Sequence, residues 1–205
     1  MIYNQPQIYM KNTLLILSLI FMVAISVHAQ SLSGGVKAGL NVANQNISYG
    51  SISFDSKSKI GIHVGGYVTL MFTEKLGLQP ELLYSTQGCK LEFAEDYKYN
   101  LSYLNLPVLV RYNITEMISA HAGPQFGFLT SAKYEVDGAS VDSKEDFKGI
   151  DFSLVFGAGV ELPLGLNAGM RYCLGLSNIS EDEDESGTIK NSNFQIYVGY
   201  RLFGQ

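Results

Sequence analysis

The sequence predicts an all-β fold: an eight-stranded antiparallel up-and-down transmembrane β-barrel with short periplasmic turns and longer extracellular loops. Apolar residues alternate with small or polar residues at a period of two from Ser33 onward, which is typical of strands with differently solvated faces. The polar face carries few charges. The connections between alternating segments are short and long in turn, as in bacterial outer-membrane barrels.

The amino-acid composition agrees with a transmembrane β-barrel. Of the 205 residues, 21 are Gly, 12% are aromatic and only 16% are charged. Glycine suits the inside of a narrow barrel, where backbones and large side chains lie close together. The formal net charge of -5 argues against nucleic acid as a partner, because binding the phosphate backbone requires a basic surface.

The amino end predicts a secretory signal peptide. Lys11 precedes an apolar run from Leu14 to Val27, and Ala29 supplies a small residue before the expected cut. We expect residues 1–29 to be this peptide, with 1–9 an upstream extension before Met10, and 30–205 to be the barrel. A retained anchor helix is the alternative, but the apolar run is short for a span, and no later segment approaches the ~20 apolar residues that a spanning helix needs.

Eight segments share the two-residue alternation. In one of them Ile62, Val64 and Val68 lie on one face, while His63 and Tyr67 lie on the other. The alternation fits half-solvated strands, because successive side chains of a strand point to opposite faces. The segments are 35–42, 60–72, 76–85, 103–112, 118–128, 151–161, 166–175 and 195–202.

The position of the charges predicts which face meets lipid. All charged residues within these segments fall on the polar face, at about one per strand, whereas a water-exposed face would carry many more. An Arg turned toward lipid would cost up to ~2–4 kcal/mol at the bilayer midplane, so we expect the polar face to line the lumen. The predicted lumen charges are Lys37, Glu81, Arg111, Glu161, Arg171 and Arg201.

The predicted connections alternate in length. Long ones cover 44–58, 87–98, 132–148 and 178–191, and short ones cover 73–75, 113–116 and 163–164. Long loops on the outside and short turns in the periplasm are the usual arrangement in bacterial barrels. Aromatic residues on the apolar face, such as Tyr112 and Phe128, fall near the predicted strand ends and indicate two interfacial girdles.

Prolines and cysteines give finer expectations. Pro80, Pro107 and Pro124 each remove a ladder donor in a barrel that has no free edge, which predicts bulges or locally missing hydrogen bonds there. Cys89 and Cys173 fall on segments that we place far apart around the wall, so we expect free thiols.

Four stretches carry a resemblance to a known family: LGLQPELLYSTQGCK, YLNLPVLVRYNI, AGPQFGFLTSAK and DFSLVFGAGVELPLGLNAGMRY. They resemble the PorT-like outer-membrane β-barrel family of Bacteroidetes, and the likeness covers nearly all of the chain after the signal peptide. It implies an eight-stranded barrel with its ends in the periplasm, inserted by the outer-membrane assembly machinery. It implies little chemistry, since most relatives have no assigned activity.

The lumen charges have two interpretations. Buried charges must be paired, so the six residues can form a polar plug. They can also line a narrow path for small solutes or protons. Eight strands leave an interior just wide enough for side chains to fill, which favours the plug and a structural or surface-interaction role. A channel or carrier for small solutes is the alternative function.

Other candidate sites have weaker signals. His63 and His121 share the inward parity, with Ser119 beside His121, but no nucleophile motif supports catalysis. We therefore expect no enzyme activity, no cofactor and no metal centre. The outer segment 47–54 can meet a partner, and lipopolysaccharide and membrane lipid are the expected contacts. The last outer loop carries five acids that can gather divalent cations or remain solvated: Glu181, Asp182, Glu183, Asp184 and Glu185.

Overall fold

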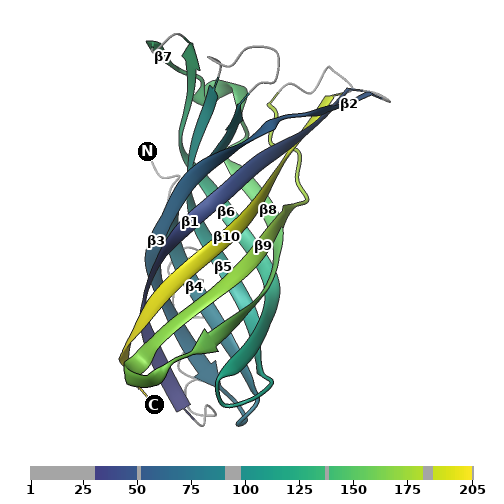
Figure 1. Cartoon of the computed structure of the whole chain (residues 1–205). Helices are drawn as coiled ribbons and strands as arrows, with labels where there is room; N and C mark the ends of the chain where they lie inside the picture. Colours follow the sequence, from purple (N-terminus) through teal and green to yellow (C-terminus); the bar gives the residue numbers. More distant parts are fainter. Residues whose placement is uncertain (1–30, 50–51, 91–97, 137–138, 182–186, 205) are drawn as a thin grey trace, which may run out of the picture.

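The computed structural model describes residues 31–49, 52–90, 98–136, 139–181 and 187–204. They form one antiparallel sheet that closes on itself, because β1 pairs with β3 on one side and with β10 on the other (Figure 1). The strands are β1 Ser31–Tyr49, β2 Ile52–Asp55, β3 Lys57–Met71, β4 Leu76–Lys90, β5 Lys98–Asn113, β6 Ile118–Val136, β7 Ala139–Asp142, β8 Ile150–Glu161, β9 Leu166–Gly175 and β10 Gly187–Phe203.

Eight of these strands make the ring, in the order β1, β3, β4, β5, β6, β8, β9, β10. The short strands β2 and β7 pair only with the outer parts of β1 and β6, and lie at the upper end of Figure 1. Two 3-10 turns, η1 (Lys144–Asp146) and η2 (Pro163–Gly165), complete the described elements. The predicted eight-stranded up-and-down barrel is therefore confirmed.

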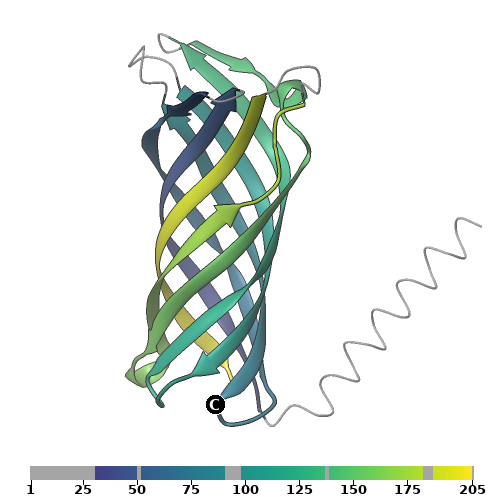
Figure 2. The ribbon, with the colours of Figure 1, turned by 90° about the vertical axis from the view of Figure 1, so that its right-hand side faces the viewer.

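The strands are steeply tilted, as Figure 2 shows. If one starts at Phe128 on β6 and steps from each residue to its paired partner around the ring, the path returns to β6 at Ile118. The end point therefore lies ten residues before the starting point on the same strand. Such a stagger tilts the strands of a closed barrel and fixes its width, and eight strands leave an interior that side chains fill.

The two faces differ as predicted. On β3 the apolar residues point outward, with Ile60 74% exposed, while His63 on the other face is only 1% exposed. Large apolar side chains cover the outside of every ring strand. This distribution is the reverse of a soluble barrel and suits a wall that contacts hydrocarbon. Among the described residues, no helix is both long and apolar enough to cross a membrane.

The three short connections are tight turns. Thr73 accepts hydrogen bonds from the backbone N–H groups of Lys75 (3.2 Å) and Leu76 (2.9 Å), and Thr115 makes the same pattern with Met117 and Ile118. A threonine hydroxyl in this position stabilises a turn locally. The third turn uses positive φ angles at Leu164 (66°) and at the residue after it (83°). We call this end of the barrel the turn end, and the opposite one the loop end.

The predicted long loops are partly wrong. β1 continues to Tyr49 and β3 begins at Lys57, so most of the predicted loop 44–58 is strand. Likewise, parts of 87–98, 132–148 and 178–191 belong to strands that flank them. Both faces of these extensions carry polar residues, which hid the alternation, and the backbone hydrogen bonds of a strand do not require an apolar face. The barrel wall thus extends past its apolar band at the loop end.

The prolines interrupt the ladder without shifting it. Between β3 and β4 the pairing of Tyr67 with Glu81 is followed by that of Leu70 with Leu78, and Pro80 lies in the gap. Equivalent gaps contain Pro107 and Pro124. The register is the same on both sides of each gap, because proline removes a donor but inserts no residue. The predicted local loss of hydrogen bonds is confirmed.

Two sequence-based predictions fall outside the described residues. The signal peptide, 1–29, is one of them, and residues 182–185 of the acidic loop are the other. Cys89 and Cys173 are both buried and unpaired, as predicted.

Candidate functional site

Three charged side chains meet in the middle of the lumen. Glu81 on β4 accepts from Lys37 Nζ on β1 through Oε1 (2.7 Å), and from Arg171 Nη1 on β9 through Oε2 (2.7 Å). All three side chains are at most 2% exposed. One carboxylate therefore binds two cations that come from different strands, β1 and β9. We call Lys37, Glu81 and Arg171 the central triad.

Amides and rings surround the central triad. Gln79 Nε2 donates to Glu81 Oε1 (2.7 Å), and the Nε of Arg171 donates to Gln195 Oε1. The rings of Tyr197 and Tyr67 lie 4.3 and 5.0 Å from Lys37 Nζ. Such contacts are needed, because two cations held by one anion in a dry interior leave net positive charge that dipoles and ring faces must stabilise.

A second amide layer lies next to the triad, toward the loop end. Asn41 Oδ1 accepts from Gln195 Nε2 (2.9 Å) and contacts His63 Nδ1 (2.7 Å), while Asn41 Nδ2 donates to Ser85 Oγ (2.9 Å). Gln195 bridges this layer to Arg171 of the triad. The polar side chains therefore form a connected network rather than isolated pairs, which makes each member costly to remove.

An open vestibule lies on the turn side of the triad. Its volume is about 380 Å³, and Arg111, Glu161 and Arg201 line it. Arg111 Nη2 lies 2.8 Å from Glu161 Oε1, and these side chains are 14% and 27% exposed. Arg201 makes no ion pair within the described part of the chain. A void of only about 10 Å³ separates this vestibule from Lys37, which is about the size of one water.

The loop end of the lumen is filled by apolar residues. Phe147, after η1, and Ile179, after β9, pack against inward-facing Leu101, Tyr103, Leu129 and Ala132 of β5 and β6. The backbone ties the two segments together: Lys148 N–H donates to the carbonyl of Ile179 (2.8 Å), and Phe147 pairs with Ser180. We call Phe147, Ile179 and the four wall residues the outer lid.

The sequence comparison decides the family. A family model described as "Outer membrane protein beta-barrel domain" matches residues 28–181. The chain belongs to this family of outer-membrane β-barrels. No curated protein sequence is detectably similar to it.

Several solved structures are similar to this outer-membrane barrel. Ail, the attachment invasion locus protein of Yersinia pestis, is 14% identical with a TM-score of 0.47, over 83% of this chain and 99% of that one. The corresponding figures for Neisserial surface protein A are 12%, 0.49, 80% and 96%. For OprG from Pseudomonas aeruginosa they are 13%, 0.47, 84% and 94%.

The six predicted lumen charges of this outer-membrane barrel all face inward, but they do not form one cluster. Lys37, Glu81 and Arg171 make the central triad. Arg111 and Glu161 form a separate pair, which Gln79 links to the triad because its Oε1 accepts from Arg111 Nη1 (3.2 Å). Arg201 lines the same vestibule as Arg111 and Glu161 but makes no ion pair among the described residues.

The predicted histidines lie inside the barrel without a catalytic arrangement. The His63 ring contacts Asn41, and the His121 ring lies 6.4 Å from the ring of Tyr197. No hydrogen bond joins His121 to Ser119 within the described residues, and these residues contain no group of three or more side chains suited to a metal ion. The structure thus gives these histidines lumen-filling positions.

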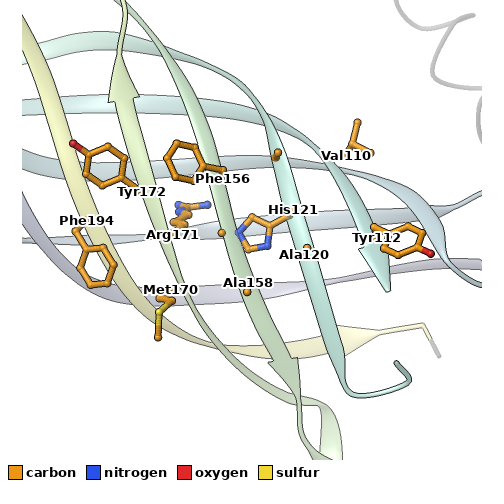
Figure 3. A pocket seen from close by; sticks show the side chains of 12 residues that line it. Val110, Tyr112, Ala120, His121, Phe156, Ala158, Met170, Arg171, Tyr172 and Phe194 are labelled. Carbon is orange, nitrogen blue, oxygen red and sulfur yellow. The ribbon is translucent and has the colours of Figure 1, made fainter. Parts of the chain in front are cut away.

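A groove of about 650 Å³ lies on the outside of the wall over β5, β6, β8, β9 and β10. Three alanines and the rings of Tyr112, Phe156, Tyr172 and Phe194 line it. Figure 3 shows these rings and, near the middle of the view, His121 and Arg171. His121 and Arg171 lie on the lumen face of their strands. Gly157 is required there, since a Cβ at this position would lie 2.5 Å from that of Arg171.

The outer lid was missed by sequence reasoning. Its wall residues are apolar but have inward parity, a combination that the alternation did not assign, and the apolar residues Phe147 and Ile179 lie in segments predicted to be loops. The only sequence signal is the presence of apolar residues at inward positions near the loop-end of two adjacent strands. Of the acidic loop only Glu181 is described: it is exposed, and its N–H donates to Asp146 O (3.1 Å).

The outer lid gives a local prediction. We expect Ile179→Ala to speed amide hydrogen exchange at Lys148 at least tenfold, because Ile179 is fully buried and truncating such a side chain costs ~2–5 kcal/mol. Val141→Ala, at an exposed position on β7, is the control and should leave exchange unchanged. Equal exchange in both variants would show that Ile179 does not hold the lid.

Proposed function

We propose that the protein is a sealed outer-membrane barrel with a structural or surface-interaction role. The observation that carries this proposal is the closure of the lumen at two levels of different chemistry. The central triad blocks the middle with paired charges, and the outer lid blocks the loop end with apolar side chains. A solute would have to displace both, and the triad members hold each other by short charge-assisted hydrogen bonds.

A narrow channel or carrier for small solutes is the second candidate. Between the triad and the lid, several buried polar atoms have no hydrogen-bond partner among the described residues, including Asn105 Nδ2, Gln125 Oε1 and both side-chain polar atoms of Asn193. Buried polar groups usually have partners, and ordered water supplies them where protein does not. A wet chamber that opens when the lid moves would suit a small polar solute.

Single-channel recording separates these functions. We expect the refolded protein in planar bilayers to show no steady openings, because the triad fills the lumen. A variant with Lys37→Ala, Glu81→Ala and Arg171→Ala together with Phe147→Ala and Ile179→Ala should open a small conductance once refolding is verified by circular dichroism. Reproducible openings of the unaltered protein would favour the channel, and a silent five-residue variant would show that other groups close the lumen.

The subfamily, export, membrane orientation and lipid contacts of the barrel are also part of the proposed function. We infer that the barrel is of the PorT-like kind on the four stretches quoted above, that residues 1–29 are removed on export, and that the assembly machinery inserts the chain with the turn end in the periplasm. The proposed contacts of the barrel are outer-membrane lipid and lipopolysaccharide. We propose no nucleic-acid partner and no catalysed reaction. The apolar outer face and the buried lumen charges support a location in the outer membrane.

A further inference from the structure

A buried carboxylate, that of Asp151 on β8, lies in the lumen beneath the outer lid. Asp151 is only 5% exposed. Its Oδ1 accepts from Ser177 Oγ (2.9 Å) and its Oδ2 from Asn191 Nδ2 (2.9 Å), which also donates to the hydroxyl of Tyr103 in the lid (3.3 Å). Asp151 forms no ion pair with the described residues. Its hydrogen bonds therefore come from neutral donors, although a buried carboxylate is costly unless it is protonated, paired with a charge or bound to a metal ion.

The inward cations of the barrel are bound elsewhere. Arg171 belongs to the central triad, and its partner position on β8 is six residues from Asp151, which is about 20 Å along a strand. Lys59, which has the inward parity of β3, donates to Asn100 Oδ1 and to the carbonyl of Gln87. By sequence, the loop-end segments outside the described ranges contain no Lys, Arg or His: 50–51, 91–97, 137–138 and 182–186. Neither the described residues nor these segments supply a counter-cation to Asp151.

Two amide oxygens lie in the same part of the lumen. Gln125 on β6 is paired with Ser153, two residues from Asp151, and its Nε2 donates to Ser153 Oγ (3.2 Å). Asn193 is two residues from Asn191 on β10, on the same inward face. Gln125 Oε1 and Asn193 Oδ1 belong to residues that are 3 and 2% exposed, and they have no hydrogen-bond partner in the described part of the chain. An eight-stranded barrel is only wide enough for its side chains, so these oxygens and the carboxylate border one small space between the lid and the central triad.

We infer that this space binds an alkali-metal cation, with Asp151 as the charged ligand and Gln125 and Asn193 as neutral oxygen ligands. One carboxylate balances one positive charge, whereas a divalent ion would leave a net charge in a buried site. The described residues contain no group of three or more His, Cys, Asp or Glu side chains. An alkali-metal cation needs no such group, because neutral carbonyl oxygens can replace its hydration shell. The inference goes beyond the sealed barrel, since the ion is held inside the closed lumen and not passed through it.

Urea unfolding of the full barrel in lipid vesicles tests the site, with N-methylglucamine chloride replaced by sodium or potassium chloride at constant ionic strength. We expect sodium or potassium to raise the folding equilibrium constant of the unaltered protein about tenfold or more, because a ligand that binds only the folded state stabilises that state. Asp151→Asn should abolish this dependence on the metal ion. The matched control is Asp142→Asn, which removes the same charge at an exposed position on β7 and should keep the dependence.

A second variant, Gln125→Met, removes a neutral ligand and keeps the carboxylate, so it decides the question even if Asp151→Asn does not refold. It should shift the dependence to about tenfold higher salt concentration. Three results would overturn the inference: equal stability of the unaltered protein in all three chlorides, an unchanged ion dependence in Asp151→Asn or Gln125→Met, or stabilisation by calcium alone. A protonated Asp151 would give the first result, with Asp151→Asn as stable as the unaltered protein. Single-channel recording tests the sealed barrel separately, so either proposal can fail without the other.

Discussion

Replacing Glu81 by Gln is expected to lower the free energy of unfolding by ~3–5 kcal/mol, because removing one partner leaves uncompensated buried charge. Here the loss is at the upper end, since Lys37 and Arg171 would both lose their carboxylate and then face each other without it. Neither side chain can reach water without unpacking the lumen. Equilibrium unfolding in denaturant, with the protein in lipid vesicles, measures the change.

The control for Glu81 lies in the same barrel. Glu161→Gln breaks an ion pair whose side chains are 14% and 27% exposed, so water partly solvates the charges and the loss should be smaller than at the fully buried Glu81. A second comparison replaces all three members of the central triad with Met, which removes the charges together and should recover most of the stability lost by Glu81→Gln. If Glu81→Gln costs no more than Glu161→Gln, the triad is not the buried charge cluster described above.

The second large effect concerns the outer face of the wall. Val198→Arg should destabilise the barrel by ~2–4 kcal/mol in a bilayer, because Val198 lies in the middle of the outward apolar band of β10 and an Arg there meets the hydrocarbon midplane. Val198 is 63% exposed, so in water the same substitution would cost little. Unfolding in vesicles, followed by tyrosine fluorescence and by gel mobility, gives the free energy.

Leu202→Arg is the matched control, on the same strand and equally exposed at 62%. It lies near the turn end, where the cost of an Arg falls to about 0–1 kcal/mol. The two variants have the same charge and the same strand context, so their difference reports depth in the membrane. Equal costs, or a larger cost at Leu202, would place the apolar band elsewhere.

The wall was predictable because lipid imposes a simple rule on each strand. Val64 and His63 are neighbours, yet one is half exposed and the other is buried, and the sequence alone assigned each to its face. The inward position of Glu81, Lys37 and Arg171 followed from the same parity. Parity does not say which inward residues meet, because that depends on the stagger of strands that are distant in sequence.

The loop end was less predictable for a related reason. Outside the apolar band no lipid distinguishes the two faces, so the strand extensions near Tyr49 and Lys57 show no clear alternation. The outer lid depends on Phe147 and Ile179 coming together from two connections, and no local pattern encodes such a meeting.

The central claim, that hydrocarbon contacts the apolar face, can be measured with single tryptophans because the sequence contains none. Val64→Trp and Val198→Trp place the indole outside the wall, and Tyr197→Trp places it in the lumen near Lys37. In vesicles of lipids with brominated acyl chains, we predict strong quenching of the two outer tryptophans and little quenching of the inner one. Quenching of Tyr197→Trp with no quenching at Val64 and Val198 would contradict this account.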